Sequence, residues 1–517
     1  MALVSAAHHA ISIARYRCQV KTLSNLILRL LLVSSLFYFF SYPEVDPDLW
    51  GHLFFGREIL REHSLLLQNL YSYTAPGYPW INHEWLAEII FYAVYRLFGS
   101  PGLILLKTSV GAGIVWLLDQ IMKRRGASLL IRAISLIWVM ALLSPGFNIR
   151  PQIFTYFLFA LLLFLFCLYE DGKKTALYGA PFLMLLWVNL HGGFLAGVGS
   201  LGLFSIWSAV TGLWNQGKKP AVFTRAFILL TLTGVALLFN PFGVGLLSFL
   251  ARDLLVERSI TEWQPIPMLD LSFLEFKLAV LFIALFSVRS ASLRRWDFIL
   301  AVVAAIFAFR YQRHTPLFAI AAAPFLAAAV ERLIRKLKDG TRKWVLVSCT
   351  LTIAVYQFYS ISEIHLQHRA QLIVNPAEYP TQAADFMARN RIRGNLVLPF
   401  DWGEYFIWKL YPEVRVSIDG RYTTAYPMEA IQEHWEWMEG KQGWRKLLEA
   451  YPAEIAITNR HHPITELLRK DPEWVYIYSD PIAFIFVRKI SSQQELLDKF
   501  KEKRLLPPRV PQIYFPG

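Results

Sequence analysis

The sequence predicts a polytopic α-helical membrane protein, with about eleven transmembrane helices and a C-terminal extracytoplasmic α/β domain. Of its 517 residues, 55% are hydrophobic and only 17% are charged, and the mean hydropathy is +0.38. A soluble chain of this length needs more charge to cover its surface. The long apolar runs lie before residue 362, whereas the remaining residues alternate strand-like and helical patterns.

A transmembrane helix needs about twenty predominantly apolar residues. The candidate spans are roughly 24–42, 101–122, 128–145, 151–170, 175–191, 194–214, 222–240, 272–288, 296–310, 315–333 and 343–361. The basic residues Arg15, Arg17 and Lys21 precede the first run, but no small-residue cleavage site follows it. We therefore interpret this run as a retained span rather than a signal peptide.

The distribution of basic residues predicts the orientation of the spans. With the N-terminus in the cytoplasm, every cytoplasmic connection is rich in Lys and Arg, as the positive-inside rule requires. These connections contain Lys123 to Arg125, Lys173-Lys174, Lys218-Lys219 with Arg225, Arg289 with Arg294-Arg295, and Arg332 through Lys343. This pattern accounts for the net charge of +14 without nucleic-acid binding. We expect a bacterial inner-membrane protein.

Residues 86–98 are apolar at helical spacing but contain Glu88 and Arg96. Counting them as a span would invert the orientation of everything downstream, so we assign them to a helix in the membrane interface. The predicted domains are a transmembrane domain, 1–361, with a first outer loop at 43–100, and an extracytoplasmic cap, 362–517. The expected cap strands are NLVLP, VRVSID, AEIAIT, WVYIYS and AFIFV. The three cysteines, Cys18, Cys167 and Cys349, do not indicate disulfides.

The first outer loop holds the densest group of candidate functional residues. Asp46 and Asp48 flank a proline that stiffens the chain, and His52 follows Asp48 at helical spacing. Asp48 is also a suitable N-cap, so a purely structural role stays open. His83 and Glu84 lie later in the same loop.

Further ionisable residues occur at the outer ends of separate spans. They are Arg150, His191, Arg310, Arg313 and His314. Any one could be a snorkelling arginine or a satisfied histidine. Together they favour a site, because ionisable groups near membrane depth usually face a cavity, a partner or a substrate.

Arginines at this boundary suit the phosphate of a lipid, because guanidinium pairs with phosphate in a bidentate manner. A neighbouring carboxylate can act as general base on an acceptor hydroxyl or amine. Such a site transfers a group from a lipid phosphate to an acceptor.

The order of these features resembles the GT-C superfamily of integral-membrane glycosyltransferases, which use polyprenyl-phosphate-linked sugars. The segment DPDLWGHLFFGREIL, and the blocks RPQIF, WVNLHGGF, FNPFG and RHTPLF, are similar to a group of bacterial transferases of this type. The resemblance implies a sugar transferred from a polyprenyl phosphate or diphosphate to a glycan, lipid or protein. It places the catalytic base at Asp48 or Asp46, and the lipid phosphate among Arg150, Arg310, Arg313 and His314. His52, His83, Glu84 and His191 are the other predicted substrate-binding residues.

The tail segment LPFDWGEYFIWKLYPEVRVSIDGRYTTAY resembles the WWDYG region of oligosaccharyltransferases, with Phe400 where a tryptophan is expected. The resemblance implies acceptor-side roles for Asp401, Trp402 and Arg421; alternatively, Trp402 packs in the core of the cap. Some superfamily members hold a divalent cation at the paired acids, so Asp46 and Asp48 are candidate ligands for Mg²⁺ or Mn²⁺.

Two other functions stay open at this stage. A transporter or flippase for a lipid-linked substrate would show inverted repeats and broken helices at mid-membrane. A non-catalytic scaffold of an envelope assembly would show acids and arginines that do not converge.

Overall fold

The computed structural model describes residues 22–216, 220–253, 256, 258–287, 295–335, 341–510 and 512–517. Several predicted features lie outside these residues. They are Arg15, Arg17, Cys18, Lys21, Lys218, Lys219, Arg289, Arg294 and the basic segment 336–340.

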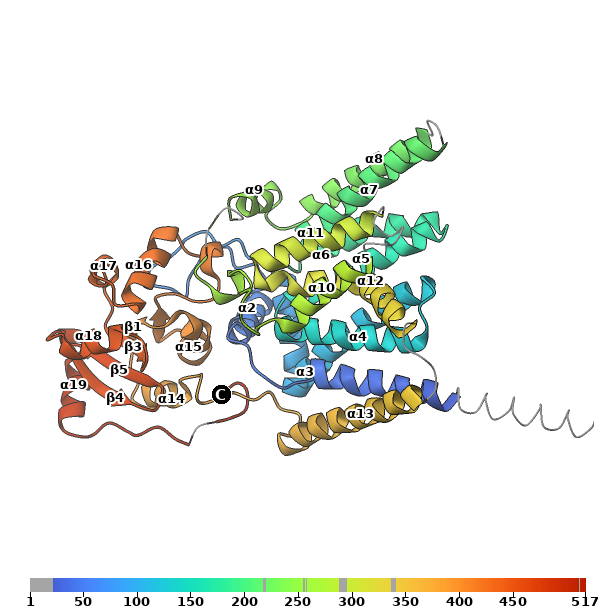
Figure 1. Cartoon of the computed structure of the whole chain (residues 1–517). Coiled ribbons are helices and arrows are strands. Elements are labelled where there is room, and N and C mark those ends of the chain that lie inside the picture. The colour runs from blue at the N-terminus through green and yellow to red at the C-terminus, as the bar shows by residue number, and fades with distance from the viewer. Residues whose placement is uncertain are drawn as a thin grey trace, which may run out of the picture.

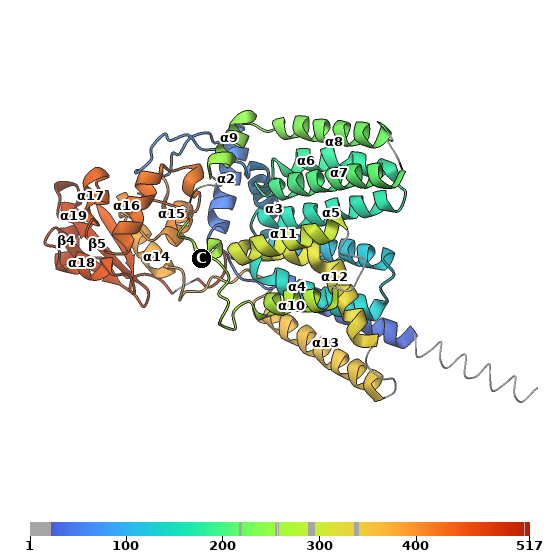
Figure 2. The ribbon, with the colours of Figure 1, turned by 45° about the horizontal axis from the view of Figure 1, so that its top comes forward.

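The chain forms a helical bundle and a C-terminal sheet domain, with helix α2 (Leu49–Glu62) lying between them (Figures 1 and 2). The bundle is built from the helix Thr22–Phe40, α3 (Trp85–Arg124), α4 (Leu129–Leu143), α5 (Gln152–Glu170), α6 (Gly179–Trp187), α7 (Phe194–Gln216), α8 (Pro220–Leu238), α10 (Leu274–Ser287), α11 (Trp296–Arg310), α12 (Thr315–Arg335) and α13 (Thr341–Gln367). A short helix, α9 (Val244–Asp253), lies in the connection after α8. Each predicted span coincides with a helix of this bundle.

Within the described residues, six helices are long and apolar enough to cross a membrane. These are Thr22–Phe40, Trp85–Arg124, Leu129–Gly146, Gln152–Glu170, Phe194–Thr211 and Gln312–Ile334. The other predicted spans fall on helices that are shorter or less apolar, so the number eleven stays a prediction. Large apolar side chains such as Leu105, Trp116 and Phe182 are exposed on the bundle, as expected for a surface that faces lipid.

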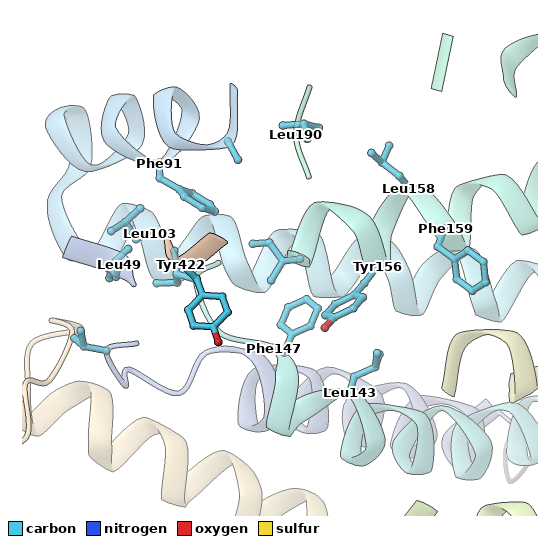
Figure 3. Close-up of a cluster of buried hydrophobic side chains, with 14 of the residues drawn as sticks. Leu49, Phe91, Leu103, Leu143, Phe147, Tyr156, Leu158, Phe159, Leu190 and Tyr422 are labelled. Atoms are coloured by element: carbon cyan, nitrogen blue, oxygen red, sulfur yellow. The ribbon is translucent and has the colours of Figure 1, made fainter. Parts of the chain in front are cut away.

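Helix α3 contains residues 86–98, which the sequence allows either to cross the membrane or to lie in its interface. Its 40 residues are interrupted at Gly99, where φ is 61° and ψ is −156°. Glycine tolerates this left-handed backbone, and Pro101 follows within the same turn. The residues before Gly99 therefore form a separate helical piece, which packs against α2. Figure 3 shows Phe91 and Leu103, from the two pieces, near Phe147 and Tyr156 in the buried core.

The C-terminal domain contains every strand that the sequence predicted. The strands are β1 (Gly394–Val397), β2 (Val414–Val416), β3 (Ile455–Asn459), β4 (Trp474–Ser479) and β5 (Ala483–Arg488). The five-stranded sheet has the order β2-β1-β3-β5-β4, with β1 parallel to β2 and β3 and with β5 antiparallel to β3 and β4. Helices α14 (Thr381–Arg389), α15 (Gly403–Leu410), α16 (Met428–Met438), α17 (Arg445–Ala450), α18 (Ile464–Lys470) and α19 (Gln494–Lys501) accompany it. We call this domain the cap.

The first loop is bound tightly to the cap. Ser72 forms a parallel β-bridge with Val416, the last residue of β2. The indole nitrogen of Trp50 donates a hydrogen bond to the carbonyl of Pro516 at 2.9 Å. One hydrophobic cluster runs without a break from the bundle through Leu49 and Phe54 into the cap sheet. Burial of this apolar surface holds the loop, the bundle and the cap in one fixed arrangement.

Candidate active site

Helix α2 starts at Leu49, directly after Asp48, as the sequence predicted. Asp48 occupies the N-cap position, but its side chain makes no capping hydrogen bond. The backbone N–H of His52 donates instead to the carbonyl of Asp48, at 3.0 Å. The carboxylate of Asp48 is therefore directed away from the helix end, and it is available for other contacts.

Arg150 binds both loop aspartates at the cap-facing end of the bundle. It lies in the turn just before Pro151, which fixes the start of α5. Its Nε donates to Asp46 Oδ1 at 2.5 Å, and its Nη2 lies 2.9 Å from Asp48 Oδ2. Asp46 also accepts hydrogen bonds at 3.0 Å from Asn148 Nδ2 and from the backbone N–H of Asp48. Asp46 is thus saturated with donors, whereas Asp48 keeps one oxygen free of Arg150.

A second arginine reaches the same cluster through a glutamate. Glu262, in the short helix η3 (Thr261–Trp263), lies 3.2 Å from Arg150 Nη1 and 3.2 Å from Arg313 Nη1. Arg313, in η5 (Gln312–His314), also stacks on the ring of Trp263, with its guanidinium carbon 4.4 Å from the ring centre. Asp46, Asp48, Arg150, Glu262 and Arg313 form a network that we call the arginine cluster.

The cap contributes a further carboxyl, Glu404, at the start of α15. The backbone N–H of Gly51 donates to Glu404 Oε2 at 3.1 Å. A Cβ on Gly420 would lie 2.7 Å from Asp48 Oδ1 and 2.9 Å from Glu404 Oε1, so a larger residue would push both carboxyl ends aside. Asp48 and Glu404 are therefore neighbours at the boundary between loop and cap.

These two carboxyls differ in how readily they ionise. Burial raises the pKa of Asp48 to about 7, because lost hydration outweighs the attraction of Arg150. Burial, with the charges of Asp48 and Asp419, raises the pKa of Glu404 well above its usual range. The carboxyl of Glu404 therefore favours its neutral form more than an exposed glutamate does.

A histidine–glutamate cluster lies beside the arginine cluster. Glu84 Oε1 is 3.7 Å from His83 Nε2 and 3.6 Å from His191 Nε2, and His52 Nδ1 is 3.9 Å from Glu88 Oε1. The backbone N–H of Gly193 donates to His191 Nδ1 at 2.9 Å, so the proton of this ring is on Nε2 and points toward Glu84. Burial lowers the pKa of His191 to about 3, which keeps the ring neutral.

The paired aspartates do not fit a divalent cation. The guanidinium of Arg150 lies against both carboxylates, in the position between them that a cation would need. Among the described residues, no group of three or more His, Cys, Asp or Glu side chains is arranged to hold a metal ion. The expected role of Asp46 and Asp48 as Mg²⁺ or Mn²⁺ ligands is therefore not supported by their geometry.

Arg310 and His314 take no part in the ion pairs that define the two clusters. Arg310 is exposed at the end of α11 and faces the ring of Tyr311, and His314 packs among the rings of Trp263, Phe307 and Tyr311. Neither side chain joins the ion pairs of the site, because depth and side of the membrane do not fix the direction of a side chain. A contact of either residue with lipid phosphate stays a prediction.

The acceptor-side roles predicted for Asp401, Trp402 and Arg421 stay predictions, and the structure shows where these side chains lie. Trp402 is buried in the cap and donates a hydrogen bond to the carbonyl of Glu378 at 3.0 Å. Arg421 is buried, pairs with Asp419 at 2.7 Å, and donates to Asn69 of the first loop at 2.9 Å. These two residues serve packing and the attachment of the loop to the cap. Asp401 is exposed at the surface, yet burial of its carboxyl raises its pKa against the attraction of Arg150, so this carboxyl lies near the arginine cluster.

The sequence did not single out Glu262 or Glu404. Glu262 lies in the long connection after α8, where the segment ITEWQP has no recognisable pattern. Glu404 follows Asp401-Trp402-Gly403, and its position beside Gly420 depends on contacts between segments far apart in the chain. A lone acid next to a glycine turn is the only local signal for it.

No protein-family model matches the chain, and no curated protein matches it significantly. Solved structures do match. The arabinofuranosyltransferase AftD from Mycobacteria matches with a TM-score of 0.53 and 14% identity, over 90% of this chain and 40% of AftD. ArnT from Cupriavidus metallidurans in the apo state gives 0.50 and 12%, over 92% of this chain and 99% of ArnT. ArnT bound to undecaprenyl phosphate gives 0.49 and 11%, over 90% and 98%.

The chain thus spans less than half the length of AftD but nearly the whole of ArnT. At these identities the likeness concerns the fold. Together with the apolar helices of the bundle, it shows a multi-pass membrane protein, and the chain has the GT-C-like fold expected from its sequence.

Proposed function

We propose that this chain is a membrane glycosyltransferase that moves a sugar from a polyprenyl-phosphate or polyprenyl-diphosphate donor to a glycan, lipid or protein acceptor. The observation that carries the proposal is the position of Asp48, a carboxyl that ionises near neutral pH, 2.9 Å from Arg150 and linked through it to Arg313. The GT-C-like fold supports the same reaction class. The protein would lie in the bacterial inner membrane, with its N-terminus cytoplasmic and its cap extracytoplasmic.

In the proposed reaction Asp48 is the general base. Its carboxylate takes the proton from an acceptor hydroxyl or amine, and the freed electron pair attacks the anomeric carbon of the sugar. The bond between that carbon and the phosphate oxygen breaks, and the phosphate leaves with the bonding electrons. Arg150 and Arg313 stabilise the negative charge that develops on it. Asp46 holds Arg150 in place through the bond to Nε.

The alternative of a flippase or transporter finds less support. Such proteins place binding groups near mid-membrane on broken helices. The charged groups described above instead gather at the end of the bundle that faces the cap, in loops between helices. Their convergence also argues against a purely non-catalytic scaffold, which is expected to leave its acids and arginines apart.

The proposal is tested in a deletion strain by mass spectrometry of envelope glycans, glycoproteins and lipid-linked sugars. A sugar present in the parent should be missing from its acceptor, and its polyprenyl-linked form should accumulate. Wild-type protein should restore the modification, and Asp48→Asn should not, although it is produced at the same level. Full restoration by Asp48→Asn, or identical glycans in deletion and parent strains, would refute the proposal.

A further inference from the structure

Glu262 holds the two arginines in a way that resembles a bound phosphate. Its two carboxylate oxygens are divided between them, with Oε2 3.2 Å from Arg150 and Oε1 3.2 Å from Arg313. A tetrahedral phosphate presents two oxygens to two guanidinium groups in the same manner. We propose that Glu262 is a built-in anion that occupies the phosphate subsite, and that the phosphate of the donor displaces it. This inference rests on the proposed function.

The charges of the cluster favour an exchange of one anion for another. Arg150 and Arg313 supply two positive charges, while Asp46, Asp48 and Glu262 supply up to three negative ones. A phosphate that entered beside Glu262 would join an excess of negative charge, and like charges at short range repel strongly. A phosphate that takes the place of Glu262 finds Nη1 of Arg150 and Nη1 of Arg313 open to it, while Asp46 and Asp48 keep Arg150 in place.

The structure allows the side chain to leave while its backbone stays in place. Glu262 is the most accessible of the three, with 33% of its side chain exposed against 18% for Arg150 and 23% for Arg313. The segment after it is pinned, because Ile266 N–H donates to Phe309 and Gln312 N–H donates to Gln264. Rotation of one side chain therefore opens the subsite without movement of the loop.

The same exchange would link donor binding to the base. Glu262 and Asp48 both contact Arg150, through Nη1 and Nη2 respectively. A phosphate in place of Glu262 is thus held by the guanidinium that also contacts Asp48. The reacting carbon of the donor then lies on the side of the cluster where Asp48 can receive the acceptor proton.

The test measures binding of radiolabelled undecaprenyl phosphate to the full-length protein in nanodiscs. Glu262→Gln keeps the shape of the side chain but removes its charge. It should bind undecaprenyl phosphate about fivefold to tenfold more tightly than wild type, because two partly exposed ion pairs no longer compete. The matched control is Glu275→Gln, an equal change of charge at an exposed position in the first turn of α10, which should bind as wild type does. Undecaprenol, which lacks the phosphate, should bind to either variant no more tightly than to wild type.

Several outcomes would overturn the inference. Binding by Glu262→Gln that is equal to or weaker than wild type would make Glu262 a structural bridge for the arginines. If Glu262→Gln binds inorganic phosphate more tightly than wild type but undecaprenyl phosphate no more tightly, the assignment of the subsite to a lipid headgroup is wrong. If Glu262→Gln fails to fold, Glu262→Asp, too short to reach both arginines, should still bind about twofold more tightly. Absence of binding by wild type and all variants would refute the proposed function itself.

Discussion

The pair of carboxyls at the boundary between loop and cap yields a sharp prediction, because the two should respond differently to the same change. Asp48→Asn removes the group that ionises near neutral pH. Loss of a general base typically lowers a rate by about 10²-fold to 10⁴-fold. Glu404→Gln mimics the neutral form of this carboxyl, which burial and the charges of Asp48 and Asp419 favour. The glutamine oxygen can still accept the hydrogen bond from Gly51. We expect this variant to keep activity within about threefold of wild type.

The pKa of Asp48 sets how strongly the transfer rate should depend on pH. Asp48 must be deprotonated to act as a base, so the rate should rise with pH and reach half its maximum at about pH 7. With this pKa, only about a tenth of the carboxyl is ionised one pH unit lower, so the rate at pH 6 should be about tenfold below that at pH 8. The assay is the release of polyprenyl phosphate from the sugar-charged donor, in membranes of the complemented strain.

Thermal stability distinguishes a variant that has lost the general base from a variant that no longer folds. The folded pKa of Asp48 lies above its ordinary value of 3.8, so the folded state binds this proton more tightly than the unfolded state. The contribution to stability is therefore present at low pH and is lost as the pH rises from about 4 to about 7. Asp48→Asn should consequently unfold at a higher temperature than wild type at pH 8. Equal inactivity of Asp48→Asn and Glu404→Gln, or a rate that does not change between pH 6 and pH 8, would refute the reasoning.

Three further predictions concern the surroundings of Asp48. Gly420→Ala places a Cβ 2.7 Å from Asp48 Oδ1 and should lower the rate at least tenfold, whereas Gly199→Ala, with open space around it, should be neutral in the same assay. Arg421→Met leaves a buried carboxylate unpaired, at a cost of about 3–5 kcal/mol, and should expose the first loop to limited proteolysis; unchanged protease resistance would contradict this. Chelation with EDTA should leave transfer unchanged, because Arg150 occupies the position between the aspartates; loss of transfer that Mg²⁺ restores would show the opposite.

The sequence predicted the architecture well because each element has a local signal. Hydrophobic runs mark the helices of the bundle, and short β-branched and aromatic runs mark all five strands of the cap. Both signals arise from residues adjacent in the chain. The piece at 86–98 was harder, since only one backbone angle, at Gly99, separates it from the rest of α3. Its place in the membrane interface stays a prediction.

The site was predicted only in part, because its contacts join distant segments. Asp46, Asp48 and Arg150 converge as their shared side of the membrane suggested, yet Arg310 and His314 point elsewhere. Glu404 meets Gly51 across 353 positions of the chain, and no local pattern records such a contact. The residues within reach of Asp48 are therefore set by tertiary packing, which periodicity and spacing do not describe.

The attachment of the first loop to the cap has a consequence for the timing of assembly during synthesis. Asp48 and its helix are made early, but the partners of this helix come much later, since Trp50 meets Pro516 across 466 positions. A ribosome adding about 5–20 residues each second needs tens of seconds to bridge that interval. For most of it, until residues 404 and 420 have been made, the loop has no Glu404 and no Gly420 beside it. A nascent chain therefore carries Asp48 for a long time without the neighbours that complete the candidate site.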